Sequence, residues 1–293
     1  MDQAEELRNV IKKQNQRTKK PARIITVTSG KGGVGKSNIA VNLAVQFQRM
    51  GVKTIIFDAD IGLANVEVMF GTIPQYSLND LIYHDKEIED IITDGPEGVG
   101  FISGGSGIMG LSNLTLDQIS YLVKSVEKLS VIADIVIVDT GAGISDSVME
   151  FVASSPEILL VTTPEPSSLT DAYSLLKMLY RNPKYDKNES VIHVLTNRVA
   201  SFGEGKMVFD KLESVVKQFL DGSVHYIGII PQDAMLEKAV RIQKPVSRGY
   251  STMACPRKVA AVCSTISLKR VLSRVLASLD KVRMVPSGSA RCS

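Results

Sequence analysis

The chain has 293 residues, of which 44% are hydrophobic, 22% are charged and 5% are aromatic. This composition excludes a disordered or collagen-like chain, and the length allows one large domain or two small ones. Tryptophan is absent, so a nucleic-acid surface built on stacked aromatic side chains is not expected.

The net charge of +3 conceals an uneven distribution. Residues 1–23 contain seven Lys/Arg and three Asp/Glu, and residues 253–293 contain eight Lys/Arg and one Asp. Residues 24–252 contain 19 basic and 27 acidic side chains. Two basic ends on an acidic body indicate that the ends contact something negative, such as lipid, nucleic acid or an acidic protein.

Nothing in the sequence predicts export or a membrane span. The N-terminus lacks the apolar run of a signal peptide, and no stretch approaches ~18 uncharged apolar residues. The three cysteines form no C-x-x-C pair, which favours a reducing compartment without disulfides or structural zinc. We therefore expect a cytoplasmic protein.

Residues 1–22 are predicted to form a polar arm, because Pro21 disfavours a continuing helix. After it, short Ile- and Val-rich runs alternate with longer helical stretches. Most of these runs are continuously apolar, which is typical of strands buried on both faces of a parallel sheet. The expected fold over residues 23–266 is α/β, with a doubly wound, mostly parallel sheet, helices on both faces and ligands at the carboxyl ends of the strands. The predicted strands are 24–29, 54–58, 99–103, 135–140, 158–163, 191–197 and 224–230.

Residues 267–285 are predicted to form an amphipathic helix, followed by a frayed tail at 286–293. Its apolar residues recur at spacings of three and four, and cations fill other positions. Such a helix either inserts into an anionic membrane or packs on the sheet, and the sequence leaves both open. The apolar face contains Leu268, Val271, Leu272, Val275, Leu276 and Leu279.

The first predicted strand runs directly into a loop with the pattern G-x-x-x-x-G-K-[ST]. Between a strand and a helix, this pattern predicts a phosphate-binding loop, in which glycines let backbone N–H groups converge on phosphate oxygens. Lys36 supplies a charge for the β- and γ-phosphates, and Ser37 offers a hydroxyl to Mg²⁺. Lys31 is a second lysine that a plain phosphate loop does not need. The expected nucleotide-binding residues here are Gly30, Lys31, Gly32, Gly33, Val34, Gly35, Lys36 and Ser37.

Two later strands end in aspartates. Asp58 and Asp60 follow one strand, and Asp139 ends another at the position where a Walker B aspartate holds Mg²⁺ through water. An aspartate at a strand end often only caps a helix. Three of them in one phosphate-loop fold favour a role in the reaction, one orienting water and the others assisting Mg²⁺. We expect the metal site to contain Ser37, Asp58 and Asp139.

Together these segments resemble the deviant Walker A ATPases of the MinD/ParA type and, within that group, the flagellar number regulators of the FlhG type. The resemblance covers about residues 24–250. It implies an ATPase that uses ATP and Mg²⁺ and switches from monomer to homodimer. Lys31 falls on the group's signature lysine, which reaches phosphate across the dimer interface. Asp60 falls on the switch I aspartate that positions water, and residues 139–143 fall on switch II. With Lys36, Lys31 and Asp60 are the expected catalytic residues.

Further nucleotide contacts rest on the resemblance alone. Glu165 falls on a residue that contacts the nucleotide of the opposite protomer, and Asn197 falls on a strand end whose amide reads adenine. Asn38 departs from the threonine usual in the group, but its backbone N–H is still expected to serve the α-phosphate. The loop expected to close over the base contains Pro231, Gln232 and Asp233.

The two ends carry resemblances of their own. Residues 2–8 are similar to the activator element that FlhG-type proteins present to the flagellar GTPase FlhF, which implies contacts from Gln3, Leu7 and Arg8 and a water-ordering role for Gln3. Residues 267–285 resemble the membrane-targeting helix of MinD-type proteins. The implied function is slow ATP hydrolysis, reversible membrane association, and control of flagellar number or placement through FlhF and C-ring proteins.

Two other functions remain open. A ParA-like ATPase of DNA segregation would place the basic ends on duplex DNA, a partner we do not expect here, and strongly salt-dependent DNA binding would distinguish it. A metal-cluster carrier of the Mrp type needs paired cysteines near the dimer interface, and Cys255 and Cys263 do not form such a pair.

Overall fold

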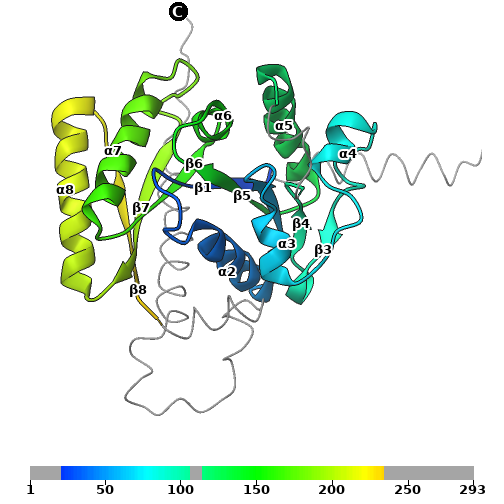
Figure 1. Ribbon diagram of the computed structural model, residues 1–293, viewed down its shortest axis with the longest axis horizontal. Coiled ribbons are helices and arrows are strands. Elements are labelled where there is room, and N and C mark those ends of the chain that lie inside the picture. Colours follow the sequence, from blue (N-terminus) through cyan, green and yellow to red (C-terminus); the bar gives the residue numbers. More distant parts are fainter. Residues whose placement is uncertain (1–20, 106–113, 234–293) are drawn as a thin grey trace, which may run out of the picture.

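The computed structural model describes residues 21–105 and 114–233, which form one sheet with helices on both faces (Figure 1). The strand order is β3-β4-β2-β5-β1-β6-β7-β8. All neighbours are parallel except β3, which is antiparallel to β4. The strands are β1 (Arg23–Ser29), β2 (Thr54–Ala59), β3 (Thr93–Asp94), β4 (Gly100–Ile102), β5 (Ile135–Ala142), β6 (Glu157–Thr162), β7 (Val191–Val199) and β8 (His225–Pro231).

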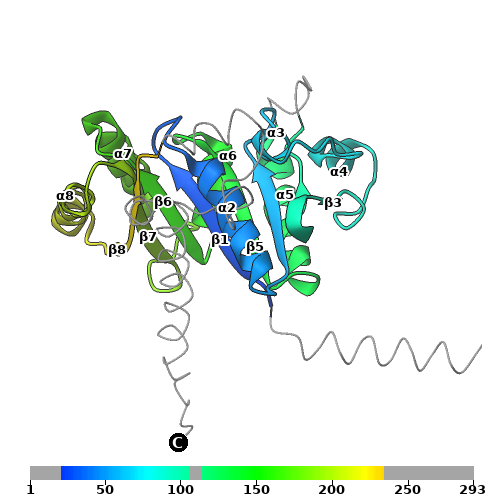
Figure 2. The same cartoon turned by 90° about the horizontal axis from the view of Figure 1, so that it is seen from below.

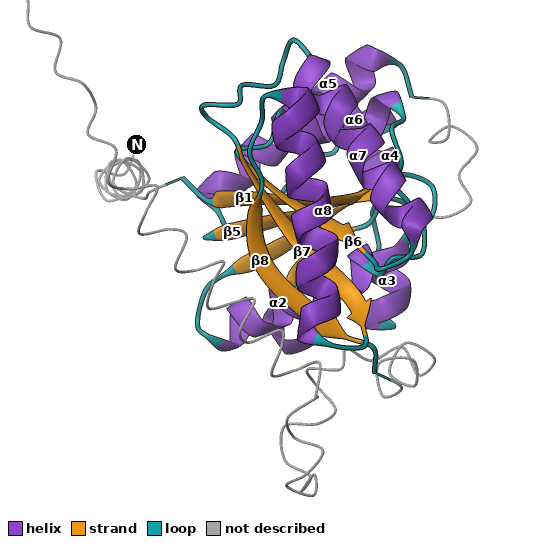
Figure 3. Cartoon of the chain, turned by 90° about the vertical axis from the view of Figure 1, so that its left-hand side faces the viewer, coloured by secondary structure: helices purple, strands orange, loops and turns teal. Residues whose placement is uncertain are grey.

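The helices form two layers around the sheet (Figures 1 and 2). One face is covered by α2 and α3, and the other by α4 to α8. From the β8 side, α8 lies against β7 and β8 (Figure 3). The helices are α2 (Lys36–Arg49), α3 (Asn65–Phe70), α4 (Leu78–Tyr83), α5 (Leu116–Lys128), α6 (Asp146–Ala153), α7 (Pro166–Arg181) and α8 (Phe202–Leu220), with short 3-10 turns η1 (Pro96–Gly98) and η3 (Leu129–Val131).

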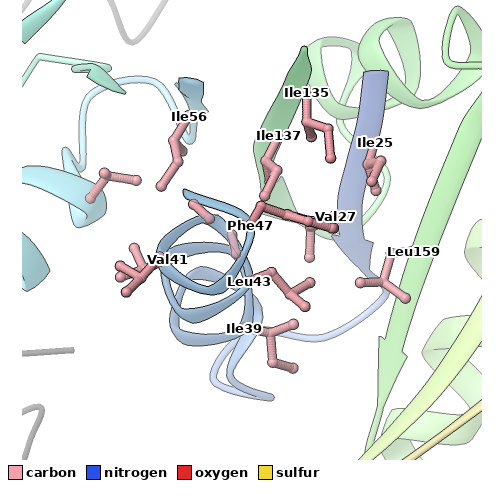
Figure 4. Close-up of a cluster of buried hydrophobic side chains, with 14 of the residues drawn as sticks. Ile25, Val27, Ile39, Val41, Leu43, Phe47, Ile56, Ile135, Ile137 and Leu159 are labelled. Atoms are coloured by element: carbon pink, nitrogen blue, oxygen red, sulfur yellow. The ribbon is translucent and has the colours of Figure 1, made fainter. Parts of the chain in front are cut away.

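Helix α2 is held by an apolar core. Alternate strand residues point to opposite faces, so Ile25 and Val27 of β1 face α2, where Leu43 and Phe47 pack against them (Figure 4). Phe47 is completely buried, and full burial of such a side chain contributes about 2–3 kcal/mol. This packing keeps α2, and the loop that precedes it, in a set position on the sheet.

The predicted fold class is confirmed, and each of the seven predicted strands is present with its ends within two residues. Strand β3 was not predicted. It has only Thr93 and Asp94, too few residues to show a period-2 pattern. Among the described residues, no helix combines the length and apolar character needed to cross a membrane.

The strand order brings the predicted site together. Strand β5 lies between β1 and β2, and Asp58 of β2 and Asp139 of β5 are direct partners in the parallel ladder. The carboxyl ends of the three strands therefore meet at one edge, next to the loop that leaves β1.

Candidate nucleotide site

The loop from Gly30 to Ser37 joins β1 to α2 in a shape suited to an anion. Gly33 and Gly35 have φ angles of 75° and 99°, a region that favours glycine. Gly35 precedes the first turn of α2 without a side-chain cap, so the helix N-terminus keeps free N–H groups for a ligand. Gly30 is needed for a different reason. A Cβ atom there would lie 2.1 Å from the Asp171 carbonyl of α7.

Lys36, the first residue of α2, is the buried cation of the site. Its side chain lies among the carboxylates of Asp139 and Asp60. Burial lowers the pKa of Lys36, and the two carboxylates oppose this shift. The loop thus presents a desolvated ammonium group, which interacts strongly with phosphate oxygens because water screens it poorly.

Asp58 and Asp139 are completely buried side by side. Both oxygens of Asp58 accept backbone N–H groups, from Asp60 at 3.2 Å and from Val66 at 3.0 Å. Burial, followed by the charge of Asp139, raises the pKa of Asp58. Asp58 therefore organises the turn into α3, a role close to the helix-capping alternative for strand-end aspartates.

Asp139 is different, because neither of its oxygens accepts a hydrogen bond of standard geometry from the described residues. Burial raises the pKa of Asp139 to about 7, although the nearby Ser37 hydroxyl and the Lys36 ammonium both oppose the shift. A buried carboxylate without a partner is costly. Together with the Ser37 hydroxyl, it forms the hard oxygen donor set that Mg²⁺ prefers.

Asp60 lies half-buried at the rim. Its Oδ2 accepts a hydrogen bond of 2.7 Å from Asn65 Nδ2, and its Oδ1 faces the backbone of Gly141, where an added Cβ would lie 3.1 Å away. Burial raises the pKa of Asp60, while Lys36 and Asn65 oppose this. The carboxylate is thus held in one orientation.

A cavity of about 990 Å³ opens above these groups. The phosphate loop, switch I and switch II all contribute to its wall, and Leu114 and Ile119 line it from the α5 side. The expected residues that reach it are Gly32, Gly33, Gly35, Lys36, Ser37, Asn38 and Asp60. Its size and its mix of glycine backbone, cation and carboxylates suit a nucleoside triphosphate tail.

Lys31 and Glu165 are brought together within one chain. The Lys31 ammonium donates to Glu165 Oε2 at 2.7 Å and to Ser167 Oγ at 2.8 Å. Glu165 precedes α7, and hydrogen bonding and charge from Lys31 lower the pKa of its carboxyl. The pair lies outside the cavity wall, on an exposed surface.

Asn197, near the end of β7, holds the phosphate loop. Its Nδ2 donates to the Val34 carbonyl at 2.7 Å, while its buried Oδ1 has no partner among the described residues. Strand β8 pairs with β7, so residues Pro231 to Asp233 lie next to the end of β7 that carries Asn197. Gln232 donates its backbone N–H to the Val199 carbonyl at 3.1 Å.

Two residues of the site were missed by sequence reasoning. Asn65 belongs to the switch I segment but had no assigned role until its bond to Asp60 was visible. Arg198 lines the cavity, has a φ of 56°, and sits where the β7–β8 register shifts. Bulges of this kind change the direction of side chains near active sites. An arginine in a strand gives no sequence signal for a bulge, so this residue could not be predicted. The predicted partner and membrane residues, Gln3, Leu7, Arg8 and 267–285, lie outside the described residues.

Comparison with known proteins agrees with this geometry. The ParA family model, described as NUBPL iron-transfer P-loop NTPase, matches residues 20–267. The chain is 41% identical over 230 residues to the antiactivator FleN of Pseudomonas aeruginosa, covering 78% of this chain and 81% of that protein. It is 34% identical to the flagellum site-determining protein YlxH of Helicobacter pylori, covering 83% and 82%.

A solved structure agrees in fold. The cell division ATPase MinD of Pyrococcus furiosus superposes with a TM-score of 0.71 at 21% identity, covering 88% of this chain and 99% of that one. With the phosphate loop, the buried lysine and the strand-end aspartates in place, the expected chemistry is that of ATP hydrolysis with Mg²⁺. The chain belongs to the ParA/MinD family of P-loop ATPases.

Proposed function

We propose that this chain is a nucleotide-controlled switch that regulates flagellar number and placement, being a homodimer with ATP and a monomer with ADP. The similarity to FleN and YlxH over about four fifths of the chain supports the flagellar role. The nucleotide controls the oligomeric state, because the two copies share their ATP sites and stay paired only while a triphosphate is bound between them.

The chemical step is the in-line attack of water on the γ-phosphorus. Asp60 orients the water, and the observation that carries this assignment is its carboxylate, held by Asn65 in the same cavity wall as Lys36 and Ser37. Lys36 and Lys31 stabilise the charge that develops on the phosphate oxygens. Among the described residues that line the cavity, Asp60 is the one we assign to activate water, and activation by a single carboxylate is expected to give slow hydrolysis.

Mg²⁺, when bound, shields the charge of the β- and γ-phosphates. Ser37 and Asp139 would hold it, directly or through water, because the two Asp139 oxygens lie beside the Ser37 hydroxyl and accept no hydrogen bond of standard geometry in the described part of the chain. Asp58 contributes negative charge from the neighbouring strand, while its hydrogen bonds to the backbone hold the switch I turn.

Adenine recognition is assigned to Asn197. An asparagine amide complements the N6 and N7 edge of adenine by donating one hydrogen bond and accepting another. Asn197 donates one N–H to Val34, and its Oδ1, which has no partner among the described residues, is assigned to the base together with the second N–H. Pro231, Gln232 and Asp233 close the base pocket from β8, and the Asn38 backbone serves the α-phosphate.

Dimerisation is assigned to the exposed surface beside the cavity. Lys31 and Glu165 retain 36% and 56% of their side-chain exposure. Leu63, which lines the cavity, and Ile144, directly after switch II, are exposed apolar side chains. A second copy would bury them and bring its Lys31 to this chain's phosphates, and Glu165 would contact the partner's nucleotide.

The ends are assigned to partners. Gln3, Leu7 and Arg8 would stimulate an FlhF-type GTPase, and residues 267–285 would bind anionic membrane in the cytoplasm, with the apolar face inserted. Two tails in a dimer bind more tightly than one through avidity, which links membrane binding to ATP. C-ring proteins are the proposed target of the membrane-bound dimer.

The test of the switch is the oligomeric state of Asp60→Ala. Without the water-orienting carboxylate, ATP persists and the variant should sediment as a dimer with ATP and as a monomer with ADP. Asp90→Ala, at an exposed position, is the matched control and should return to monomer as ATP is consumed. A monomeric Asp60→Ala in saturating ATP contradicts the proposal.

The two ends are tested separately. Gln3→Ala should lose stimulation of the GTPase while keeping its own ATPase rate, and undiminished stimulation would dismiss the arm's role. A chain truncated after Thr265 should no longer float with anionic liposomes in ATP. Duplex DNA binding that weakens steeply with salt would instead favour the DNA-segregation function.

A further inference from the structure

The segment Ser103–Gly105, directly after β4, has no role in the proposed chemistry, yet it connects three elements around switch I. Ser103 Oγ donates to Glu67 Oε2 of α3 at 2.6 Å. The Ser103 carbonyl accepts the N–H of Leu78, the first residue of α4, at 3.0 Å. The Gly104 carbonyl accepts the N–H of Gly62, within switch I, at 3.3 Å.

Gly104 lies unusually close to the backbone that presents Asp60. A Cβ atom at position 104 would be 2.9 Å from the Asp58 carbonyl oxygen and 3.3 Å from the Asp60 carbonyl oxygen. Ordinary van der Waals contact begins at 3.4 Å. Any side chain would therefore force the two backbones apart by about half an ångström. Gly104 is not among the residues with positive φ, so close approach, and not backbone freedom, explains the glycine.

Asp60 is consequently held from three directions. Gly104 supports its backbone from β4, Asn65 holds its Oδ2, and the Gly141 backbone faces its Oδ1 from β5. The supports from β4 and β5 come from opposite sides of β2, because β2 lies between these two strands in the sheet. A displacement on the β4 side thus shifts the carboxylate relative to the phosphate loop.

We propose that Gly104 is a positioning residue for ATP hydrolysis: its lack of a side chain lets the end of β4 support switch I and so sets the position of Asp60. This inference rests on the proposed role of Asp60 in orienting water. Misplacing a reacting group by about 1 Å can cost about 100-fold in rate, so a shift of half this size has a measurable effect.

The test compares Gly104→Ala with Gly203→Ala. Gly203 is in the first turn of α8, where an added Cβ meets nothing closer than 3.9 Å. We expect Gly104→Ala to lower kcat by about 10-fold or more, with KM for ATP and ATP affinity changed by less than about 3-fold. Gly203→Ala should match the wild type in all three. Unchanged kcat in Gly104→Ala overturns the proposal, as does an equal loss of ATP affinity.

A milder pair of variants decides the matter if Gly104→Ala does not fold. Glu67→Ala removes the acceptor for Ser103 and should lower kcat in the same direction, whereas Glu67→Gln keeps an acceptor and should restore it. Wild-type kcat in Glu67→Ala then overturns the proposal. Asp60→Ala is assayed alongside. If it hydrolyses ATP normally, the proposed water-orienting role fails. If it is inactive while Gly104→Ala and Glu67→Ala are fully active, only this inference fails.

Discussion

The Lys31 ammonium and the Glu165 carboxylate form an ion pair of 2.7 Å within a single chain. Both residues are expected to act across a dimer interface, so ATP-driven pairing requires Lys31 to leave Glu165 for the partner's phosphate. An exposed ion pair of this kind contributes little to stability, because water and salt screen the two charges. A triphosphate therefore easily draws Lys31 from Glu165, because its charge is much larger than that of one carboxylate. A diphosphate lacks the γ-phosphate and drives this exchange of partners poorly.

Lys31→Ala should abolish ATP-dependent dimerisation and leave ATP binding by the monomer within a few-fold of wild type, because Lys36 and the loop backbone remain. Sedimentation with ATP, ADP or no nucleotide measures the first quantity, and calorimetry the second. Lys177→Ala, an exposed lysine of α7, is the control. A Lys31→Ala protein that still pairs in ATP would remove the basis for the switch.

Lys36→Gln should weaken ATP binding by about 10- to 100-fold, since a hydrogen bond to a charged group contributes about 1.5–3 kcal/mol. The glutamine side chain is polar and one bond shorter than lysine, and it carries no charge. Lys124→Gln on the exposed surface of α5 should bind like the wild type. Equal affinity of Lys36→Gln and wild type by calorimetry would contradict the phosphate-binding role.

Asp139→Asn should stabilise the nucleotide-free protein and disable it. The change removes the charge of a buried carboxylate whose oxygens accept no hydrogen bond of standard geometry from the described residues, and removing a buried charge of this kind favours the folded state. We therefore expect a higher Tm without ligand and no further rise when Mg²⁺ and ATP are added. Asp90→Asn is the control. A lower Tm in the ligand-free variant, or an undiminished response to Mg²⁺, would count against the metal site.

His193 should make stability depend on pH. Burial, helped by His225 and Arg23, lowers the pKa of His193 to about 4, and Glu157 lies 3.9 Å from its Nε2. Between the ordinary pKa of about 6.5 and the folded value, the unfolded chain binds a proton that the folded chain does not. Stability contributed by the neutral imidazole is therefore lost as pH falls through this window.

Between pH 7 and pH 5 this loss amounts to about 2 kcal/mol. Chemical denaturation at the two pH values should show a drop in wild type that is smaller by this amount in His193→Gln. Asp58 and Asp139 titrate in the opposite direction, but they are present in both proteins and cancel. An unchanged drop in His193→Gln would refute the assignment.

The fold and the phosphate loop were predictable because their signals are local. Continuous apolar runs predict buried parallel strands whatever their order, and the eight residues from Gly30 to Ser37 carry their chemistry in consecutive positions. Parallel strands also place their carboxyl ends at one edge, so the meeting of Asp58, Asp60 and Asp139 could be anticipated. Strand β3 could not be, because its two residues form a strand only by pairing with β4.

Tertiary structure decided how these groups divide their roles. Strand order made Asp58 and Asp139 ladder partners, and packing then gave Asp58 two backbone donors, whereas Asp139 has none within residues 21–105 and 114–233. Lys31 meets Glu165 across 134 positions, and Asn197 meets Val34 across 163. Such contacts depend on how whole helices and strands pack together, and that packing is decided by many small interaction energies spread over the chain. A motif depends only on residues that are neighbours in the sequence.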